Sequence, residues 1–180
     1  MKSNIEVKKI DITDLDVDVI VNAANSRLQE GGGVCGAIFR KAGANELADA
    51  CSEIGHCETG NAVITPGFNL KAKYIIHAVG PIWSGGDSNE AELLSNAYRR
   101  SLALAKENGC HTIGFPLISS GIYGYPKRQA WQKAIQACDD FINNNPDYSI
   151  SITFAVMSDG SKEMGEMHWM NSTDKQEASF

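Results

Sequence analysis

Two loops rich in glycine, serine and amide side chains carry the residues of this 180-residue chain that are best suited to chemistry. The first loop covers 22–38 and contains three consecutive glycines, Gly31 to Gly33, before a segment expected to be helical. Glycine lets the backbone approach a ligand closely, and the N–H groups at a helix start attract anions. A flexible surface loop is the alternative, but the helix start favours an anion site.

The second loop covers 116–126 and also follows an expected buried strand and opens a helix. Its serines and glycines could contact a second side of the same phosphate group, and its tyrosines could cover a sugar. The alternative is that this loop is only a structural turn. Ligands of open α/β sheets bind beyond the carboxyl ends of the strands. The two loops therefore predict a diphosphate held between two helix N-termini.

Other nucleotide-binding motifs fit the sequence less well. The phosphate-loop pattern GxxxxGK[ST] does not occur, so nothing indicates a nucleoside triphosphatase. Gly31, Gly33 and Gly36 satisfy GxGxxG, but residues 22–30 separate them from the preceding strand. In dinucleotide-binding folds the glycines follow the first strand almost at once. An NAD-dependent oxidoreductase is therefore the weaker interpretation.

Strands and helices alternate along the chain, which predicts an α/β layer fold with a largely parallel sheet and helices on both faces. Asn89 and Glu92 resemble a capping box, and Gly109 supplies the helix stop. We expect strands over 5–12, 18–22, 61–65, 73–79, 111–116 and 149–157, and helices over 37–41, 44–54, 90–108, 126–144 and 162–170.

The composition fits one domain with a substantial core, since 43% of the residues are hydrophobic. A net charge of −6 argues against a nucleic-acid partner. No apolar run is long enough for a membrane span, and the N-terminus does not read as a signal peptide. The five cysteines are odd in number, with no CxxC pair and no evident metal-ligand set. We expect a cytoplasmic protein with no membrane partner, no metal and no disulfide framework.

Taken together, six segments resemble the macrodomain family, specifically the MacroD-type class of ADP-ribose hydrolases and O-acetyl-ADP-ribose deacetylases. The resemblance implies a three-layer α/β/α sandwich with a mixed, largely parallel sheet, formed by residues 1–170, with 171–180 as a polar tail. The matching segments, in the family's order, are Asp11-Ile12-Thr13, VDVIVNAAN (17–25), GGGVCGAI (31–38), TGNAVIT (59–65), YIIHAVGPIW (74–83) and FPLISSGIYGYP (115–126).

The resemblance also implies which residues bind adenine. Asp11 would accept a hydrogen bond from the adenine amine, and the Ile12 N–H would reach a ring nitrogen. Val156 or Met157, at the end of the last strand, would pack on the adenine ring. Asp11 has an alternative role, which is to cap the next turn through Thr13.

The rest of the ligand would lie between the two loops. Asn22 and Asn25 would sit by the distal ribose, although a structural bridge between loops is an equal alternative for Asn22. His77 is expected to be structural. The diphosphate and distal ribose would contact Gly32, Gly33, Val34 and Cys35 on one side and Ser119, Ser120, Gly121, Ile122 and Tyr123 on the other.

Three residues of the first loop depart from the MacroD-type pattern: Glu30 replaces a glycine, Phe39 a histidine, and Cys35 the aspartate proposed to orient or activate water. Because a general base contributes roughly 10²–10⁴-fold, Cys35 is the departure that bears on catalysis. Covalent catalysis by Cys35 is disfavoured, since no partner histidine is near it in sequence, and a small residue packed beside the ribose is preferred.

The resemblance implies a hydrolase that needs no cofactor, with Asn25, Gly33 and Cys35 at the reacting centre. It would remove mono-ADP-ribose from modified acidic side chains, deacetylate O-acetyl-ADP-ribose, or both. Its expected partners are ADP-ribose and mono-ADP-ribosylated proteins, and its expected state is a monomer. The alternative function is a non-catalytic reader of ADP-ribose, which Cys35 favours.

Overall fold

The computed structural model describes residues 3–178, with side chains described as far as Met170. It contains one six-stranded sheet, in the order β1-β6-β5-β2-β4-β3. All neighbouring pairs are parallel except β3 and β4, which are antiparallel. The strands are β1 (Asn4–Lys9), β2 (Val19–Ala23), β3 (Ala62–Pro66), β4 (Tyr74–Ala78), β5 (Thr112–Phe115) and β6 (Ser151–Val156).

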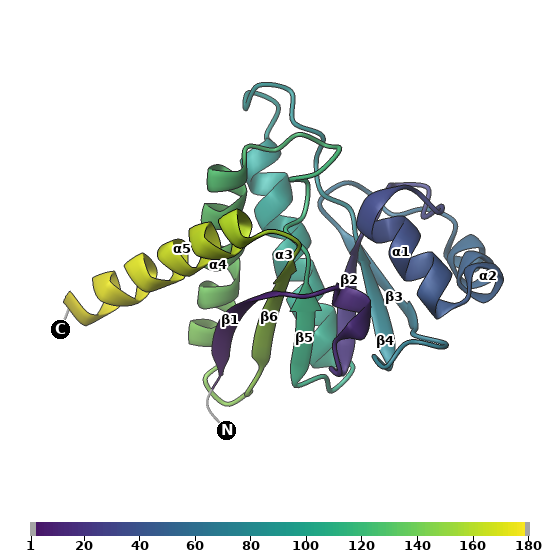
Figure 1. Cartoon of the computed structure of the whole chain (residues 1–180), viewed down its shortest axis with the longest axis horizontal. Coiled ribbons are helices and arrows are strands. Elements are labelled where there is room, and N and C mark those ends of the chain that lie inside the picture. The colour runs from purple at the N-terminus through teal and green to yellow at the C-terminus, as the bar shows by residue number, and fades with distance from the viewer. Residues whose placement is uncertain (1–2, 179–180) are drawn as a thin grey trace.

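The helices cover both faces of the sheet, as Figure 1 shows. They are the short 3-10 helix η1 (Ile12–Asp14), α1 (Gly33–Ala42), α2 (Ala44–Ile54), α3 (Glu90–Glu107), α4 (Lys127–Asn144) and α5 (Asp159–Ala178). The predicted three-layer α/β/α sandwich with a mixed, largely parallel sheet is therefore confirmed.

Alternation along the central strands explains the two layers of core. Val19 and Val21 of β2 pack on the side of α3 and α4, whereas Ile20 between them packs on the side of α1 and α2. On β4, Ile75 and Ile76 divide in the same way. Because successive side chains of a strand point to opposite faces, a fully apolar strand contributes side chains to the core on each side of the sheet.

Several predicted element boundaries were wrong. The first strand ends at Lys9 because Asp11 caps η1 instead of continuing the strand. Helix α1 begins at Gly33, earlier than the expected residue 37, so the glycine run forms the first turn itself. Helix α5 begins at Asp159 and continues through residue 170 to Ala178, whereas a short helix over 162–170 was expected. The side chains of the predicted polar tail, 171–180, lie outside the described residues.

The expected capping box at the start of α3 is also absent. Asn89 adopts a left-handed conformation with φ of 65°, and its side chain makes no cap hydrogen bond. Glu92 instead pairs with Arg99 at 3.0 Å. The carboxylate that orders this helix start belongs to Glu90, which accepts from the backbone of the preceding loop.

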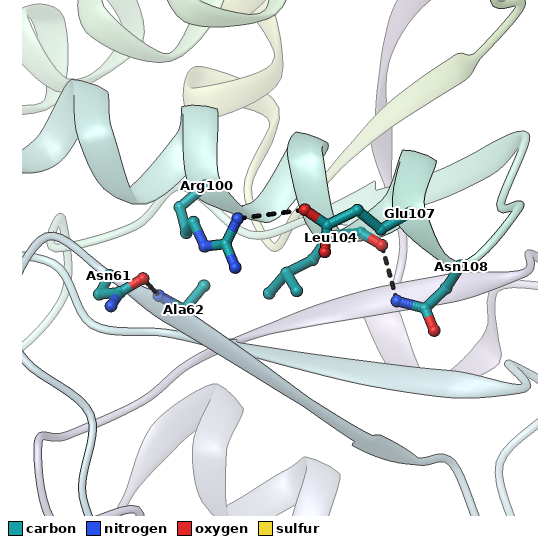
Figure 2. Close-up of polar contacts among 6 residues, drawn as sticks. All are labelled: Asn61, Ala62, Arg100, Leu104, Glu107 and Asn108. Carbon is teal, nitrogen blue, oxygen red and sulfur yellow. Dashed lines mark hydrogen bonds and ion pairs between the residues drawn. The ribbon is translucent and has the colours of Figure 1, made fainter.

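The end of α3 agrees with the sequence. The Asn108 side chain donates to the Leu104 carbonyl at 2.9 Å (Figure 2). Gly109 follows with φ of 68°. Figure 2 also shows the Arg100–Glu107 pair, 3.4 Å apart, on the same helix. The Asn108 side chain thus provides a donor for one carbonyl of the last turn, where the backbone of a helix lacks partners of its own.

Candidate active site

The two predicted loops meet at one cavity of about 460 Å³. The first loop leaves the carboxyl end of β2 and the second leaves that of β5, and these strands are parallel neighbours. The cavity is lined by most of the predicted site residues, namely Asn25, 32–35, 119–123 and Met157. Asp11, Ile12 and Asn22 are not part of its wall.

The first loop presents the open N-terminus of α1 to the cavity. Gly32 is the N-cap and has no side chain to close it. Gly33, Val34 and Cys35 are the first three helical residues, and all line the cavity. The first N–H groups of a helix have no acceptor within it, so these three are available to an anion.

The glycine run is held in place by close packing at Gly36. A Cβ atom at this position would lie 2.6 Å from the Gly31 carbonyl oxygen, closer than such contacts allow. Only glycine therefore lets the loop fold back over the first turn of α1. This contact sets the position of the helix N-terminus.

The second loop is supported from beneath by Tyr98, a fully buried residue of α3. The Ile118 N–H donates to the Tyr98 hydroxyl at 2.9 Å, and the hydroxyl donates to the Pro116 carbonyl at 3.3 Å. Burial raises the pKa of Tyr98, so the hydroxyl stays protonated and able to donate. Within the described residues, the N–H groups of 121–123 have no backbone acceptor and are left for a ligand.

Ser119 joins the second loop to the segment that follows β4. It has a left-handed backbone with φ of 68°, and its buried hydroxyl has no hydrogen-bond partner among the described residues. A Cβ at Gly80 would lie 2.2 Å from the Ser119 Oγ, so glycine at 80 is what makes room for this serine. A strained residue with an unpaired hydroxyl at a cavity wall is typical of a binding site.

Asn25 and Cys35 both line the cavity, and the side chains of both contact the backbone of Gln29. The Asn25 amide donates to the Gln29 carbonyl at 2.9 Å and accepts from the Gln29 N–H at 3.1 Å. The Cys35 sulfur lies 3.7 Å from the same carbonyl. The amide retains one N–H and one oxygen lone pair for a ligand.

Asn22 is buried behind Cys35, 1% exposed, in a polar chain that the sequence did not reveal. Its amide nitrogen lies 3.6 Å from the Cys35 sulfur and 3.1 Å from His77 Nδ1. His77 Nε2 lies 3.0 Å from the Thr65 hydroxyl, which donates to the Pro66 carbonyl. Burial lowers the pKa of His77 to about 4, so the ring is neutral and bridges the two side chains. His77 thus lies in the buried setting expected of a structural residue, whereas Asn22 bridges two strands, β2 and β4, and not two loops. The buried Oδ1 of Asn22 has no hydrogen-bond partner among the described residues.

Asp11 also takes up the alternative contact. Its carboxylate accepts from the hydroxyl of Thr13 at 2.7 Å and from the Thr13 N–H at 2.9 Å. These hydrogen bonds, the hydroxyl first, lower the pKa of Asp11. The carboxylate is therefore ionised and retains acceptor capacity for a ligand.

The cavity and its support also include residues that were not singled out as site residues from the sequence, among them Gly80, Tyr98, Lys127, Ala155 and Ser161. Lys127 is the only charged residue among the described residues of the wall. The sequence carried a signal for Lys127, because a cation in the first turn of a helix opposes the helix dipole and a nearby anion would offset that cost.

Residues 3–170 bring together no group of three or more His, Cys, Asp or Glu side chains suited to a metal ion. None of the described helices is both long and apolar enough to cross a membrane.

Comparison with known proteins places this geometry in a family. The sequence model of the Macro domain matches residues 21–134, which include both cavity loops. The chain belongs to the macro domain family. Among its relatives, a protein of Salmonella typhimurium named O-acetyl-ADP-ribose deacetylase is 54% identical over 146 residues, covering 79% of this chain and 81% of the relative. A macro domain-containing protein of Chlorobaculum tepidum is 59% identical over 127 residues, covering 71% and 73%.

Solved structures agree with this assignment. The macrodomain of Oceanobacillus iheyensis with ADP superimposes with a TM-score of 0.91 at 37% identity, covering 97% of this macro domain and 94% of that chain. The Trypanosoma brucei macrodomain in complex with ADP-ribose gives 0.84 at 36% identity, covering 91% and 68%.

Proposed function

We propose that this macro domain is a hydrolase of ADP-ribosyl esters, acting on O-acetyl-ADP-ribose and on mono-ADP-ribose attached to acidic side chains of proteins. The name of the Salmonella relative supports the first substrate, and the neighbours holding ADP and ADP-ribose support the ligand. Mono-ADP-ribosylated protein partners and action as a monomer belong to the same proposal.

One observation carries the proposal: a single cavity joins the open N-terminus of α1 to the second loop. The diphosphate would bind the N–H groups of 33–35 and 121–123, which needs little positive charge. The distal ribose would then lie beside Asn25 and Tyr123. Met157, which is 71% exposed, would cover adenine at the other end, near Asp11 and Ile12.

The cavity wall restricts how water can be activated. No carboxylate or imidazole occurs among the described residues that line it, so no side chain there is an ordinary general base. The Asn25 amide, the backbone at Gly33 and the substrate's own phosphate would position the water instead. Hydrolysis consumes one water and yields a carboxylate, a proton and a free ribose hydroxyl.

The decisive experiment measures hydrolysis of O-acetyl-ADP-ribose and binding of ADP-ribose by calorimetry, with the variant Asn25→Ala. We expect kcat to fall about 100-fold or more, because misplacing the reacting groups by an ångström costs this much. Gln29→Ala is the matched control: it removes an exposed amide side chain but keeps the backbone groups that Asn25 contacts. Wild-type protein that binds ADP-ribose without hydrolysing either ester would contradict the proposal.

A reader of ADP-ribosylated proteins is the second candidate, favoured by the same lack of a carboxylate in the wall. The two candidates differ in turnover, because a reader binds the modified protein and leaves its ADP-ribose in place. Incubation with a protein mono-ADP-ribosylated on glutamate, followed by detection of free ADP-ribose, separates them.

A further inference from the structure

A second hollow of about 340 Å³ adjoins the cavity and shares Gly80 and Tyr123 with it. We infer that this side hollow receives the aliphatic chain of an acyl group carried by ADP-ribose, so that esters longer than acetyl are substrates. The inference rests on the proposed function. The remaining residues of the side hollow are aliphatic ones, Val79, Pro81, Ile82 and Leu93, and polar ones, Ser26, Thr59, Ser88 and Glu90.

The side hollow lies at the reacting end of the proposed ligand. Ser26 directly follows Asn25, which lines the cavity, and Tyr123 lines both spaces. With the distal ribose beside Asn25 and Tyr123, a substituent on that ribose is directed toward the side hollow rather than toward adenine. A chain entering there would remove its methylenes from water against Val79 and Leu93.

The walls are held in place without a ligand. The Trp83 N–H donates to the Tyr123 carbonyl at 2.8 Å, which ties the segment after β4 to the second loop. The Gly60 N–H donates to the Val79 carbonyl at 2.7 Å, and the Cys57 N–H to the Ser26 carbonyl at 2.9 Å. Because this space, lined by aliphatic and polar side chains, is preformed, a ligand binds there with little cost of ordering the walls.

Glu90 gives the side hollow its charge preference. Its carboxylate accepts from the N–H groups of Ser84, Gly86 and Ser88 at 3.0, 2.8 and 2.5 Å. These bonds, that of Ser84 first, lower the pKa of Glu90, so the group is ionised. A fixed negative charge accepts a neutral aliphatic chain and repels a chain that ends in a carboxylate.

The chemical step is hydrolysis of the acyl ester. Water adds to the acyl carbon, the bond between that carbon and the ribose oxygen breaks, and the ribose oxygen takes a proton. The acid leaves as a carboxylate and a proton, and the like charge of Glu90 favours its departure. No reactant other than water is needed.

The experiment compares kcat/KM for acetyl, butyryl and succinyl esters of ADP-ribose. Each methylene removed from water contributes about 0.8 kcal/mol, so we expect a rise of about 2–4-fold per added methylene from acetyl to butyryl. Succinyl has the same number of carbons as butyryl but ends in a carboxylate, and its kcat/KM should fall at least tenfold below that of butyryl.

Thr59→Trp tests the location, because Thr59 is exposed and lines the side hollow. The bulky ring should cancel the gain for butyryl and leave acetyl hydrolysis within about twofold. Glu58→Trp places the same ring on the neighbouring exposed residue, which does not line the side hollow, and should change neither. Equal kcat/KM for the acetyl and butyryl esters, or an equal loss of kcat/KM for both in Thr59→Trp, would overturn the inference and leave the proposed function standing. Absence of acetyl hydrolysis in the wild type would overturn the proposed function and the inference with it.

Discussion

Substitutions of Cys35 test most directly whether a side chain in the cavity takes part in hydrolysis. Cys35 is 6% exposed and lines the cavity, and its sulfur lies 3.6 Å from the Asn22 amide nitrogen. Because the Asn25 amide, the backbone at Gly33 and the substrate's phosphate, and not the thiol, are proposed to hold the water, Cys35→Ala should keep kcat for O-acetyl-ADP-ribose within about threefold. Cys35→Asp adds a carboxylate beside that water and should raise kcat about tenfold or more. A loss of more than 100-fold in Cys35→Ala would instead assign the thiol a direct part in the reaction.

His77 makes the stability of the domain depend on pH. Its pKa is about 4 in the folded protein, against 6.5 as the ordinary value, because it is buried. Below pH 6.5 the unfolded chain therefore binds a proton that the folded protein refuses. The free energy of unfolding should fall as the pH drops from 6.5 to 4, by roughly 3 kcal/mol in all.

Urea denaturation at several pH values measures this dependence. His77→Gln should flatten the profile over the same window, because glutamine does not titrate. Cys51, the thiol nearest the ring nitrogen Nε2, does not interfere, since burial raises its pKa to about 11. An unchanged slope in His77→Gln would show that other groups cause the dependence.

At the scale of elements, the position of α1 depends on Gly36. The Cβ of alanine at 36 would lie 2.6 Å from the Gly31 carbonyl, so loop or helix must move. We expect Gly36→Ala to lower the free energy of unfolding by about 1–3 kcal/mol and to weaken ADP-ribose binding at least tenfold. Gly160→Ala is the control, because a Cβ there meets no atom within 4 Å. Calorimetry that finds both variants equal to wild type would refute this account of the loop.

Tyr98 has the corresponding role for the second loop. Tyr98→Phe leaves the buried Ile118 N–H without its acceptor, which costs about 1–3 kcal/mol, and should weaken ADP-ribose binding because the loop loses its support. Tyr148→Phe removes a comparable hydrogen bond, to the Cys110 carbonyl before β5 and away from the cavity. It should lower the melting temperature without changing affinity. Equal affinity in both variants would contradict the role of Tyr98.

The elements and the meeting of the two loops were predictable from the sequence. Apolar runs such as 18–22 identify buried strands, and parallel strands bring the loops that follow them to one edge. The contacts made by single polar side chains were not predictable. Asn22 pairs with His77 from a neighbouring strand, and Glu90 rather than Glu92 orders the start of α3. The Asn22–His77 contact joins residues 55 apart in the sequence, and the Glu90 contacts depend on how the backbone of 84–88 folds back over the helix start. A pattern of residue types encodes neither.

For the whole molecule, the negative net charge bears on how an anionic ligand is held. The chain carries −6, and Lys127 is the one charged residue of the cavity wall within the described part of the chain. Binding through backbone N–H groups at short range is weakly screened, and the net charge repels the ligand at long range. ADP-ribose affinity should therefore change less than about threefold between 50 and 500 mM NaCl. A loss of tenfold or more, measured by calorimetry, would indicate binding dominated by exposed cations.

The contact between Gly80 and Ser119 has a consequence for how this domain can vary. The serine hydroxyl fills the space that a side chain at 80 would need, so the two positions share one volume. A side chain at 80 is tolerated only if residue 119 becomes smaller and Ile118, whose Cγ2 would lie 2.6 Å from the added Cβ, also shifts. The effects of substitutions at 80 and 119 should therefore not add in a double mutant. Since Gly80 and Ser119 lie in different loops of one cavity wall, those loops are constrained to change together, and a redesign of one must include the other.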